Sequence, residues 1–205
     1  MEFLVTMTTH VPEGTSQAAV EDVRSREAAH SGELAAQGNL LRLWRPPLQP
    51  GEWRTLGLFA AADAAALEKV LASMPLRVWR TDEVTPLSPH PNDPPHTARL
   101  GSLSSEAGNR EFLTTLTLTV PAGTPSETVD ATTAREADRA RTLGGEGRLV
   151  RLWRLPGEGR ALGLWRAHDE ADVQEIMASL PLYPWLSVET TPLTRHPSDP
   201  VSGAV

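Results

Sequence analysis

The apolar and polar residues at the start of the chain predict a strand followed by a helix. In EFLVTMTTHV (2–11) apolar residues alternate with polar ones and β-branched residues are common, which is typical of a β-strand. A turn then leads to a helix with Thr15 or Ser16 as its N-cap. The helix is expected to end near Gly38, because glycine adopts the left-handed conformation that closes many helices.

The following segments complete a unit of four strands and two helices. Strands are predicted at 39–45 and 53–60, separated by a loop rich in proline and glycine. A second helix begins after Asp63 and is stopped by Pro75, and a last extended segment covers about 81–88. The order βαββαβ is that of a ferredoxin-like domain.

The same pattern returns in the second half of the chain. Shifting 2–47 by 109 positions places it on 111–156, and shifting 54–94 by 106 positions places it on 160–200. Of the 87 positions aligned in this way, 41 are identical. A repeat of this length indicates a duplicated domain rather than a solenoid of short repeats.

The duplication predicts how the chain is organised. A four-stranded sheet with helices on one face leaves its other face bare, and two copies can cover each other's open faces. The predicted fold class is α+β, with two ferredoxin-like βαββαβ domains packed as an intramolecular pseudo-dimer of the dimeric α/β-barrel type. The domains are expected at 1–94 and 111–200, and the Ser-, Gly- and Pro-containing segment 95–110 is expected to be a linker.

The composition of the 205-residue chain is that of a globular protein, with 40% hydrophobic and 22% charged residues. A net charge of −7 argues against nucleic-acid binding, which usually needs a basic face. The absence of cysteine excludes disulfides and fits a reducing compartment. No apolar run approaches the roughly 18 residues that span a bilayer, and the first residues lack the features of a signal peptide, so a cytoplasmic protein is expected.

A glutamate lies on the apolar side of the first helix in each copy. Glu27 is seven residues from both Val20 and Leu34, so it lies on the line that faces the core, and Glu136 has the same spacing in the second copy. A carboxylate in this position is costly unless it is paired or hydrogen-bonded. Two interpretations remain open: a structural ion pair with an arginine of the next strand, or a general base whose pKa is raised in an apolar pocket.

The strand after this helix carries the sequence RLWR in both copies. Because side chains alternate along a strand, Arg42 and Trp44 share one face while Leu43 and Arg45 share the other. At least one arginine is expected to be enclosed and to need an anion, either Glu27 or the carboxylate of a ligand. The alternative is an edge arginine whose head group reaches water. The candidate ligand-binding residues are Arg42, Trp44 and Arg45, and in the second copy Arg151, Trp153 and Arg154.

Histidines near the end of each copy are weaker candidates. His90 and His196 each precede a proline, a position more typical of a loop or capping residue than of a catalyst. Arg195 precedes His196, whereas the first copy has Pro89 there. The sequence has no cluster with metal-ligand spacing, no GxSxG motif and no phosphate loop, so no metal site is predicted.

Taken in order, these features resemble the muconolactone Δ-isomerase family. The resemblance rests on the opening F-x-V-x-M-T at 3–8, Pro12, the helix with its glutamate, LWR, the turn LPL and the closing RHPS at 195–198. It covers nearly all of each copy and implies ferredoxin-like domains that dimerise through their sheets, assemble into rings and need no cofactor. For this chain it implies a homo-oligomer of fused pseudo-dimers whose partner is a small lactone or carboxylic acid, not nucleic acid or membrane.

The resemblance also implies a reaction. Such an isomerase, an intramolecular oxidoreductase that transposes a C=C bond, moves the ring double bond of muconolactone in the β-ketoadipate route of aromatic catabolism. Glu27 and Glu136 match the family's helix acid, which would carry a proton from the γ-carbon to the α-carbon of the lactone. The arginines and tryptophans of LWR, the two histidines and Arg195 would bind the substrate.

Departures from the family pattern leave the substrate open. The family has RHLWR where Arg42 and Arg151 replace the histidine, and RHPS is PHPN at 89–92, so the second copy is nearer the family. A related unsaturated lactone is an alternative substrate. Two other functions stay open: a non-catalytic binder of small organic acids, and another cofactor-free reaction such as oxygenation or decarboxylation of a polyketide-like substrate.

Overall fold

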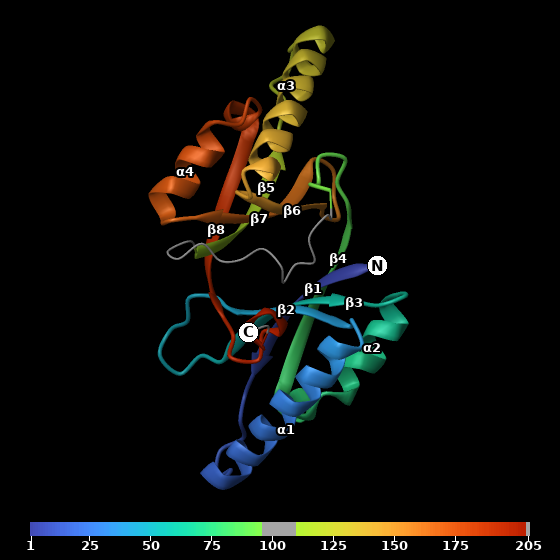
Figure 1. The fold of residues 1–205 in the computed structure, drawn as a ribbon, viewed down its shortest axis with the longest axis vertical. Helices are drawn as coiled ribbons and strands as arrows, with labels where there is room; N and C mark the ends of the chain where they lie inside the picture. Colours follow the sequence, from blue (N-terminus) through green and yellow to red (C-terminus); the bar gives the residue numbers. More distant parts are fainter. Residues whose placement is uncertain (96–109, 204–205) are drawn as a thin grey trace. The chain divides into compact units, whose positions relative to one another are not determined.

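The computed structural model describes residues 1–95 and 110–203 (Figure 1). The predicted linker at 95–110 lies, except for its two end residues, outside the described residues. The chain divides into two compact units. Unit 1 is formed by Met1–Leu87 together with the residues from Thr194 onward, and unit 2 by the described residues between Ser88 and Leu193. Within the described ranges, no helix has both the length and the apolar character needed to cross a membrane.

Unit 1 contains the first βαββαβ sequence. In chain order its elements are β1 (Glu2–Thr9), α1 (Gln17–Ala36), β2 (Leu40–Arg45), β3 (Arg54–Ala60), α2 (Ala64–Ser73), the 3-10 helix η1 (Pro75–Trp79) and β4 (Arg80–Pro89). The strands pair antiparallel in the order β4-β1-β3-β2. Ser16 and Asp63 cap the two helices, each accepting a hydrogen bond from a backbone N–H three residues on. The structure thus selects Ser16 over Thr15 as the first cap and confirms the predicted cap Asp63.

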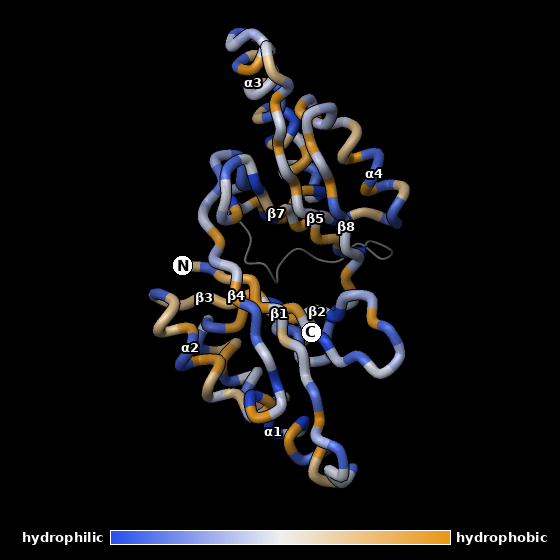
Figure 2. Tube along the Cα trace, turned by 180° about the vertical axis from the view of Figure 1, so that it is seen from behind, coloured by the Kyte–Doolittle hydropathy of each residue, from blue (hydrophilic) through white to orange (hydrophobic). Residues whose placement is uncertain are grey.

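The core of unit 1 lies between its sheet and its helices. Alternate residues of β1, including Phe3 and Val5, are buried and pack with Leu34 of α1 and Leu71 of α2. In Figure 2 the helix α2 changes between orange and blue along its length, as expected of a helix with one apolar and one polar face. The buried side chains of β1 therefore face the core, as the predicted alternation of apolar and polar residues requires.

Unit 2 repeats this architecture. Its elements are β5 (Arg110–Leu118), α3 (Ser126–Gly145), β6 (Leu149–Arg154), β7 (Arg160–Ala167), α4 (Glu170–Ala178), the 3-10 helix η2 (Tyr183–Trp185) and β8 (Leu186–Arg195). The strands pair antiparallel in the order β8-β5-β7-β6. A final 3-10 helix, η3 (Pro200–Gly203), follows β8 in the sequence and belongs to unit 1. The predicted α+β class with two ferredoxin-like units is confirmed, while the 3-10 turns before β4 and β8 were not predicted.

The end of each copy belongs to the unit of the other copy. The last residues of β8, Thr194 and Arg195, pair with β2 of unit 1. The last residues of β4, Ser88 and Pro89, pair with β6 of unit 2. The segment with His196 therefore lies in unit 1, and the segment with the first copy's histidine lies in unit 2.

Candidate active site

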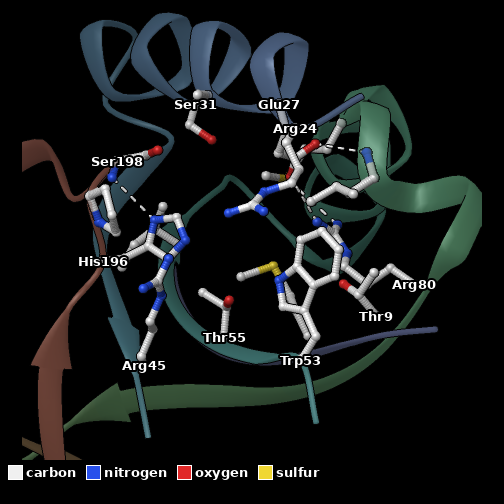
Figure 3. A pocket seen from close by; sticks show the side chains of 16 residues that line it. Thr9, Arg24, Glu27, Ser31, Arg45, Trp53, Thr55, Arg80, His196 and Ser198 are labelled. Atoms are coloured by element: carbon white, nitrogen blue, oxygen red, sulfur yellow. Dashed lines mark hydrogen bonds and ion pairs between the residues drawn. The ribbon is translucent and has the colours of Figure 1, made fainter. Parts of the chain in front are cut away.

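Unit 1 holds a cavity of about 210 Å³ lined by α1, the sheet, η1 and the segment after β8 (Figure 3). The charged, histidine and tryptophan side chains in its wall are Arg24, Glu27, Arg45, Trp53, Arg80 and His196. Polar side chains such as Thr9, Ser31 and Thr55 also line it. Figure 3 shows Glu27 and Arg80 on one side of this space and His196 and Arg45 on the other.

Glu27 faces this cavity but both of its carboxylate oxygens already accept hydrogen bonds. Its side chain is 12% exposed. Oε2 accepts from the backbone N–H of Leu76 in η1 at 2.8 Å, and Oε1 accepts from Nη1 of Arg80 at 3.1 Å. Arg80 is buried and also pairs with Asp82, with 2.6 Å between Nε and Oδ1. Glu27 is thus held in an ion pair, and the expected partner from the RLWR strand is replaced by Arg80.

His196 reaches the same cavity from the segment after β8, which ends the second copy but belongs to unit 1. This segment and its counterpart after β4 are called the exchanged end segments below. Its backbone N–H donates to the Leu43 carbonyl at 3.1 Å, which holds the residue beside β2. Its ring Nδ1 accepts from the backbone N–H of Ser198 at 3.1 Å, so in the neutral ring the proton lies on Nε2. Burial, followed by the charge of Arg45 and then of Arg24, lowers the pKa of His196 to about 4, although Asp199 opposes this. At neutral pH the ring is therefore uncharged and presents an Nε2–H donor.

Unit 2 holds the corresponding cavity, of about 350 Å³, with a more apolar wall. Glu136, His90 and Arg154 occupy the places of Glu27, His196 and Arg45. The polar positions of the first cavity are changed: Thr9, Ser31, Thr55 and Arg80 correspond to Leu118, Ala140, Ala161 and Leu186. Two glycines, Gly157 and Gly159, line this cavity where Trp53 lines the first. The second cavity is therefore larger than the first, and its wall is more apolar.

Glu136 lies in this apolar wall without an ion pair among the described residues. Its Oε2 accepts from the backbone N–H of Leu182 at 2.9 Å. Burial raises the pKa of Glu136 above its ordinary value, partly offset by the Leu182 hydrogen bond. Because Leu186 stands at the position of Arg80, no guanidinium at this place stabilises the carboxylate. The general-base interpretation therefore fits Glu136 better than Glu27.

His90 repeats the arrangement of the other histidine. Its Nδ1 accepts from the backbone N–H of Asn92 at 3.1 Å, which leaves Nε2 to carry the proton. Burial, followed by the charge of Arg154, lowers the pKa of His90 to about 4. Each cavity thus combines a glutamate from one copy with a neutral histidine from the other.

The first arginines of the two RLWR strands lie outside both cavities. Nε and Nη2 of Arg42 each donate to the Asp199 carboxylate at 3.1 Å, and both side chains are 0% exposed. In unit 2, Nε of Arg151 lies 3.3 Å from Oδ2 of Asp93. The prediction of an enclosed arginine is confirmed, but its anion is the aspartate of the end segment rather than Glu27. We therefore reassign Arg42 and Arg151 from substrate binding to anchoring the exchanged segments.

The other predicted binding residues are divided between wall and core. Arg45 and Arg154 line the cavities. Trp44 and Trp153 are buried and line neither cavity. The guanidinium of Arg42 lies over the ring of Trp44, with 4.7 Å from Cζ to the ring centroid, and that of Arg151 lies over Trp153 at 4.6 Å. Arg195 pairs with Trp44 along the strands and is also absent from the cavity walls. The alternation of the RLWR strand was predicted correctly, but the tryptophans and Arg195 are placed in structural positions.

Several cavity residues were not predicted from the sequence. Arg24 and Trp53 contact one another, with 5.3 Å from Cζ to the ring centroid, and Arg80 pairs with Glu27. In unit 2, Arg160 and Trp165 line the cavity. Arg80 differs from Leu186 in the second copy, but because more than half of the aligned positions differ, nothing in the sequence singles out Arg80. Within 1–95 and 110–203 no group of three or more histidine, aspartate or glutamate side chains is placed to hold a metal ion.

Comparison with protein families matches both copies. The family model for muconolactone delta-isomerase matches residues 1–93 and 110–199. Muconolactone Delta-isomerase 1 from Acinetobacter lwoffii is 32% identical over 87 residues, which are 42% of this chain and 91% of that protein. Muconolactone Delta-isomerase from Cupriavidus pinatubonensis is 29% identical over 92 residues, which are 45% of this chain and 97% of that protein. Each relative therefore corresponds to about one copy.

Solved structures match the whole chain in fold. A heme-binding protein from Thermus thermophilus has a TM-score of 0.59 and 10% identity, covering 97% of this chain and 93% of its own. A mutant chlorite dismutase from Candidatus Nitrospira defluvii has a TM-score of 0.54 and 13% identity, covering 96% of this chain and 92% of its own. At such identities the similarity concerns the fold alone.

Proposed function

This chain belongs to the muconolactone delta-isomerase family, and we propose that it is a cofactor-free isomerase whose unit 2 cavity moves the ring double bond of muconolactone or a related unsaturated lactone. The observation that carries the proposal is Glu136: a carboxylate in an apolar cavity, with no ion pair in the described chain and a raised pKa. A cavity of about 350 Å³ is within the size range of small-molecule sites.

The reaction needs one base that also returns the proton. Glu136 takes the proton from the γ-carbon of the lactone, and the electron pair of that C–H bond enters a dienolate. The protonated Glu136 then donates to the α-carbon, and the ring double bond has moved with no net gain or loss of electrons. Because Oε2 accepts from Leu182, Oε1 is the oxygen left for proton transfer. The raised pKa favours this task, since it makes the carboxylate a stronger base near neutral pH.

Two groups stabilise the negative charge of the substrate. His90 is neutral, and its Nε2–H can donate to the dienolate oxygen as that oxygen gains charge. Arg154 lines the cavity close enough to lower the pKa of His90, and it is suited to bind the free carboxylate of the lactone. The apolar side chains of the wall, among them Leu116, Leu152 and Trp165, exclude water and strengthen both interactions.

The test is the ultraviolet absorbance of muconolactone mixed with the protein. Glu136→Gln is expected to lower kcat by about 10²- to 10⁴-fold, the usual contribution of a general acid–base group. Glu189→Gln, at an exposed position of β8, serves as the matched control and is expected to keep full activity. Circular dichroism of each variant checks folding. Equal turnover by Glu136→Gln and the control contradicts the assignment of the base.

The pH dependence gives a second check. Only the ionised Glu136 can accept a proton, so kcat/KM is expected to fall as the pH drops through the raised pKa of Glu136. A profile that stays level down to the ordinary glutamate range contradicts this mechanism.

A further inference from the structure

The two cavities have diverged in charge although they share a glutamate, an arginine and a histidine. The cavity of unit 1 has two guanidinium groups, those of Arg24 and Arg80, at positions where unit 2 has Thr133 and Leu186. The cavity of unit 2 has Arg160 in its wall instead, and Nη1 of Arg160 donates to the Pro156 carbonyl at 3.2 Å. Arg80 is bound to Glu27 and Asp82. Within the wall of unit 1, the guanidinium groups left for a ligand are therefore those of Arg24 and Arg45.

Arg24 and Arg45 approach the same part of the cavity from different elements. Arg24 is on α1 and is held over the ring of Trp53, 5.3 Å from its centroid. Arg45 ends β2. In Figure 3 both guanidinium groups extend toward the ring of His196. Both arginines lower the pKa of His196, which agrees with a shared region of positive potential.

Neither Arg24 nor Arg45 has a carboxylate partner in the described parts of the chain. The one carboxylate in the cavity wall, Glu27, accepts from Arg80 and from the backbone of Leu76 instead. Two guanidinium groups beside a neutral histidine donor, with hydroxyl groups such as that of Thr55, form a site that favours an anion of more than one charge.

The same contacts make Glu27 a poor base. Oε2 accepts from the backbone N–H of Leu76 and Oε1 from Nη1 of Arg80, so neither oxygen is left to face a C–H bond of a ligand. Glu136 lacks the guanidinium partner. The two glutamates therefore differ in their partners: both oxygens of Glu27 accept hydrogen bonds, whereas Oε1 of Glu136 is left for proton transfer.

We propose that the unit 1 cavity is a binding site for a small dicarboxylate and does not transfer protons. The ligand's two carboxylates pair with Arg24 and Arg45, and Nε2–H of His196 donates a further hydrogen bond. The absence of proton transfer rests on the proposed function of unit 2, whereas the binding of a dicarboxylate does not.

Binding is measured by calorimetry with adipate, using hexanoate as a monoacid with the same number of carbons. Adipate is expected to bind more tightly than hexanoate by about tenfold or more, with an affinity that falls as salt is added. Arg24→Gln is expected to remove most of this advantage. Arg26→Gln is the matched control, because Arg26 lies on the same helix, pairs with Asp22 at the surface and does not line the cavity. Equal binding of the two acids, or equal adipate affinity in the two variants, overturns the dicarboxylate site.

Turnover of muconolactone tests the second part. If unit 1 transfers no protons, Glu136→Gln leaves less than about one hundredth of the activity of the native chain. If unit 1 is active, about half of the activity remains, and the proposal of a silent cavity is wrong. Should the native chain not turn over muconolactone at all, the proposed function fails, while the calorimetry still decides the dicarboxylate site.

Discussion

Asp199→Asn should detach the exchanged end segment from unit 1. Asp199 accepts hydrogen bonds from Nε and Nη2 of Arg42 at 3.1 Å and from the backbone N–H of Leu43 at 3.0 Å. Both side chains of the ion pair are 0% exposed. Asparagine keeps the shape but leaves the buried guanidinium without this counter-charge. Breaking a buried pair in this way costs about 3–5 kcal/mol of the free energy of unfolding.

The corresponding change in unit 2 should cost less. Asp93 lies 3.3 Å from Nε of Arg151, and the two side chains are 9% and 8% exposed. Water screens this pair more, so Asp93→Asn is expected to cost roughly 2 kcal/mol. Asp138→Asn is the surface control, since Asp138 and its partner Arg141 are both more than two-thirds exposed, and it should cost less than about 1 kcal/mol.

Urea unfolding followed by tryptophan fluorescence measures all three variants. A second readout is the NMR titration of His196: release of the end segment should move the pKa of His196 from about 4 toward its ordinary 6.5. If Asp199→Asn loses no more stability than the surface control, the Arg42–Asp199 pair does not hold the segment.

Three further outcomes are expected. Gly163→Ala should cost about 1–3 kcal/mol in urea unfolding, because a Cβ there would lie 2.8 Å from Cε2 of Trp165 in a packed core. Ser16→Ala should cost about 1 kcal/mol by the same measurement, since it removes the cap of α1. The stability of the native chain should fall between pH 6.5 and 4, because His90 and His196 bind protons less readily when folded and the unfolded chain takes up more. After allowance for partial exposure the loss is about 1–2 kcal/mol per histidine, and replacing both with phenylalanine should flatten the pH profile.

The strands and helices were predictable because each obeys a local rule. The period-two pattern of β1 and the caps at Ser16 and Asp63 follow from residues close together in sequence. The position of Glu27 on the inward side of α1 followed from helical spacing alone. The faces of the RLWR strand followed from strand alternation in the same way.

The partners of these residues were not predictable, because they depend on contacts distant in sequence. Arg42 meets Asp199, 157 residues away, and Glu27 meets Arg80, 53 residues away. A buried arginine requires an anion, but several carboxylates in the sequence satisfy that requirement equally well. Each cavity contains the glutamate of one copy and the histidine of the other because the end of β8 pairs with β2 and the end of β4 pairs with β6. No local pattern in the sequence predicts these strand pairs.

The exchanged ends also bear on how the gene could evolve. A single copy encodes the glutamate of one cavity and the histidine of the other, so it completes neither by itself. Joining two copies in one reading frame supplies the missing half at a high effective concentration, however dilute the protein is in solution. It also frees the copies to accept different mutations, which two identical subunits made from one gene could never do.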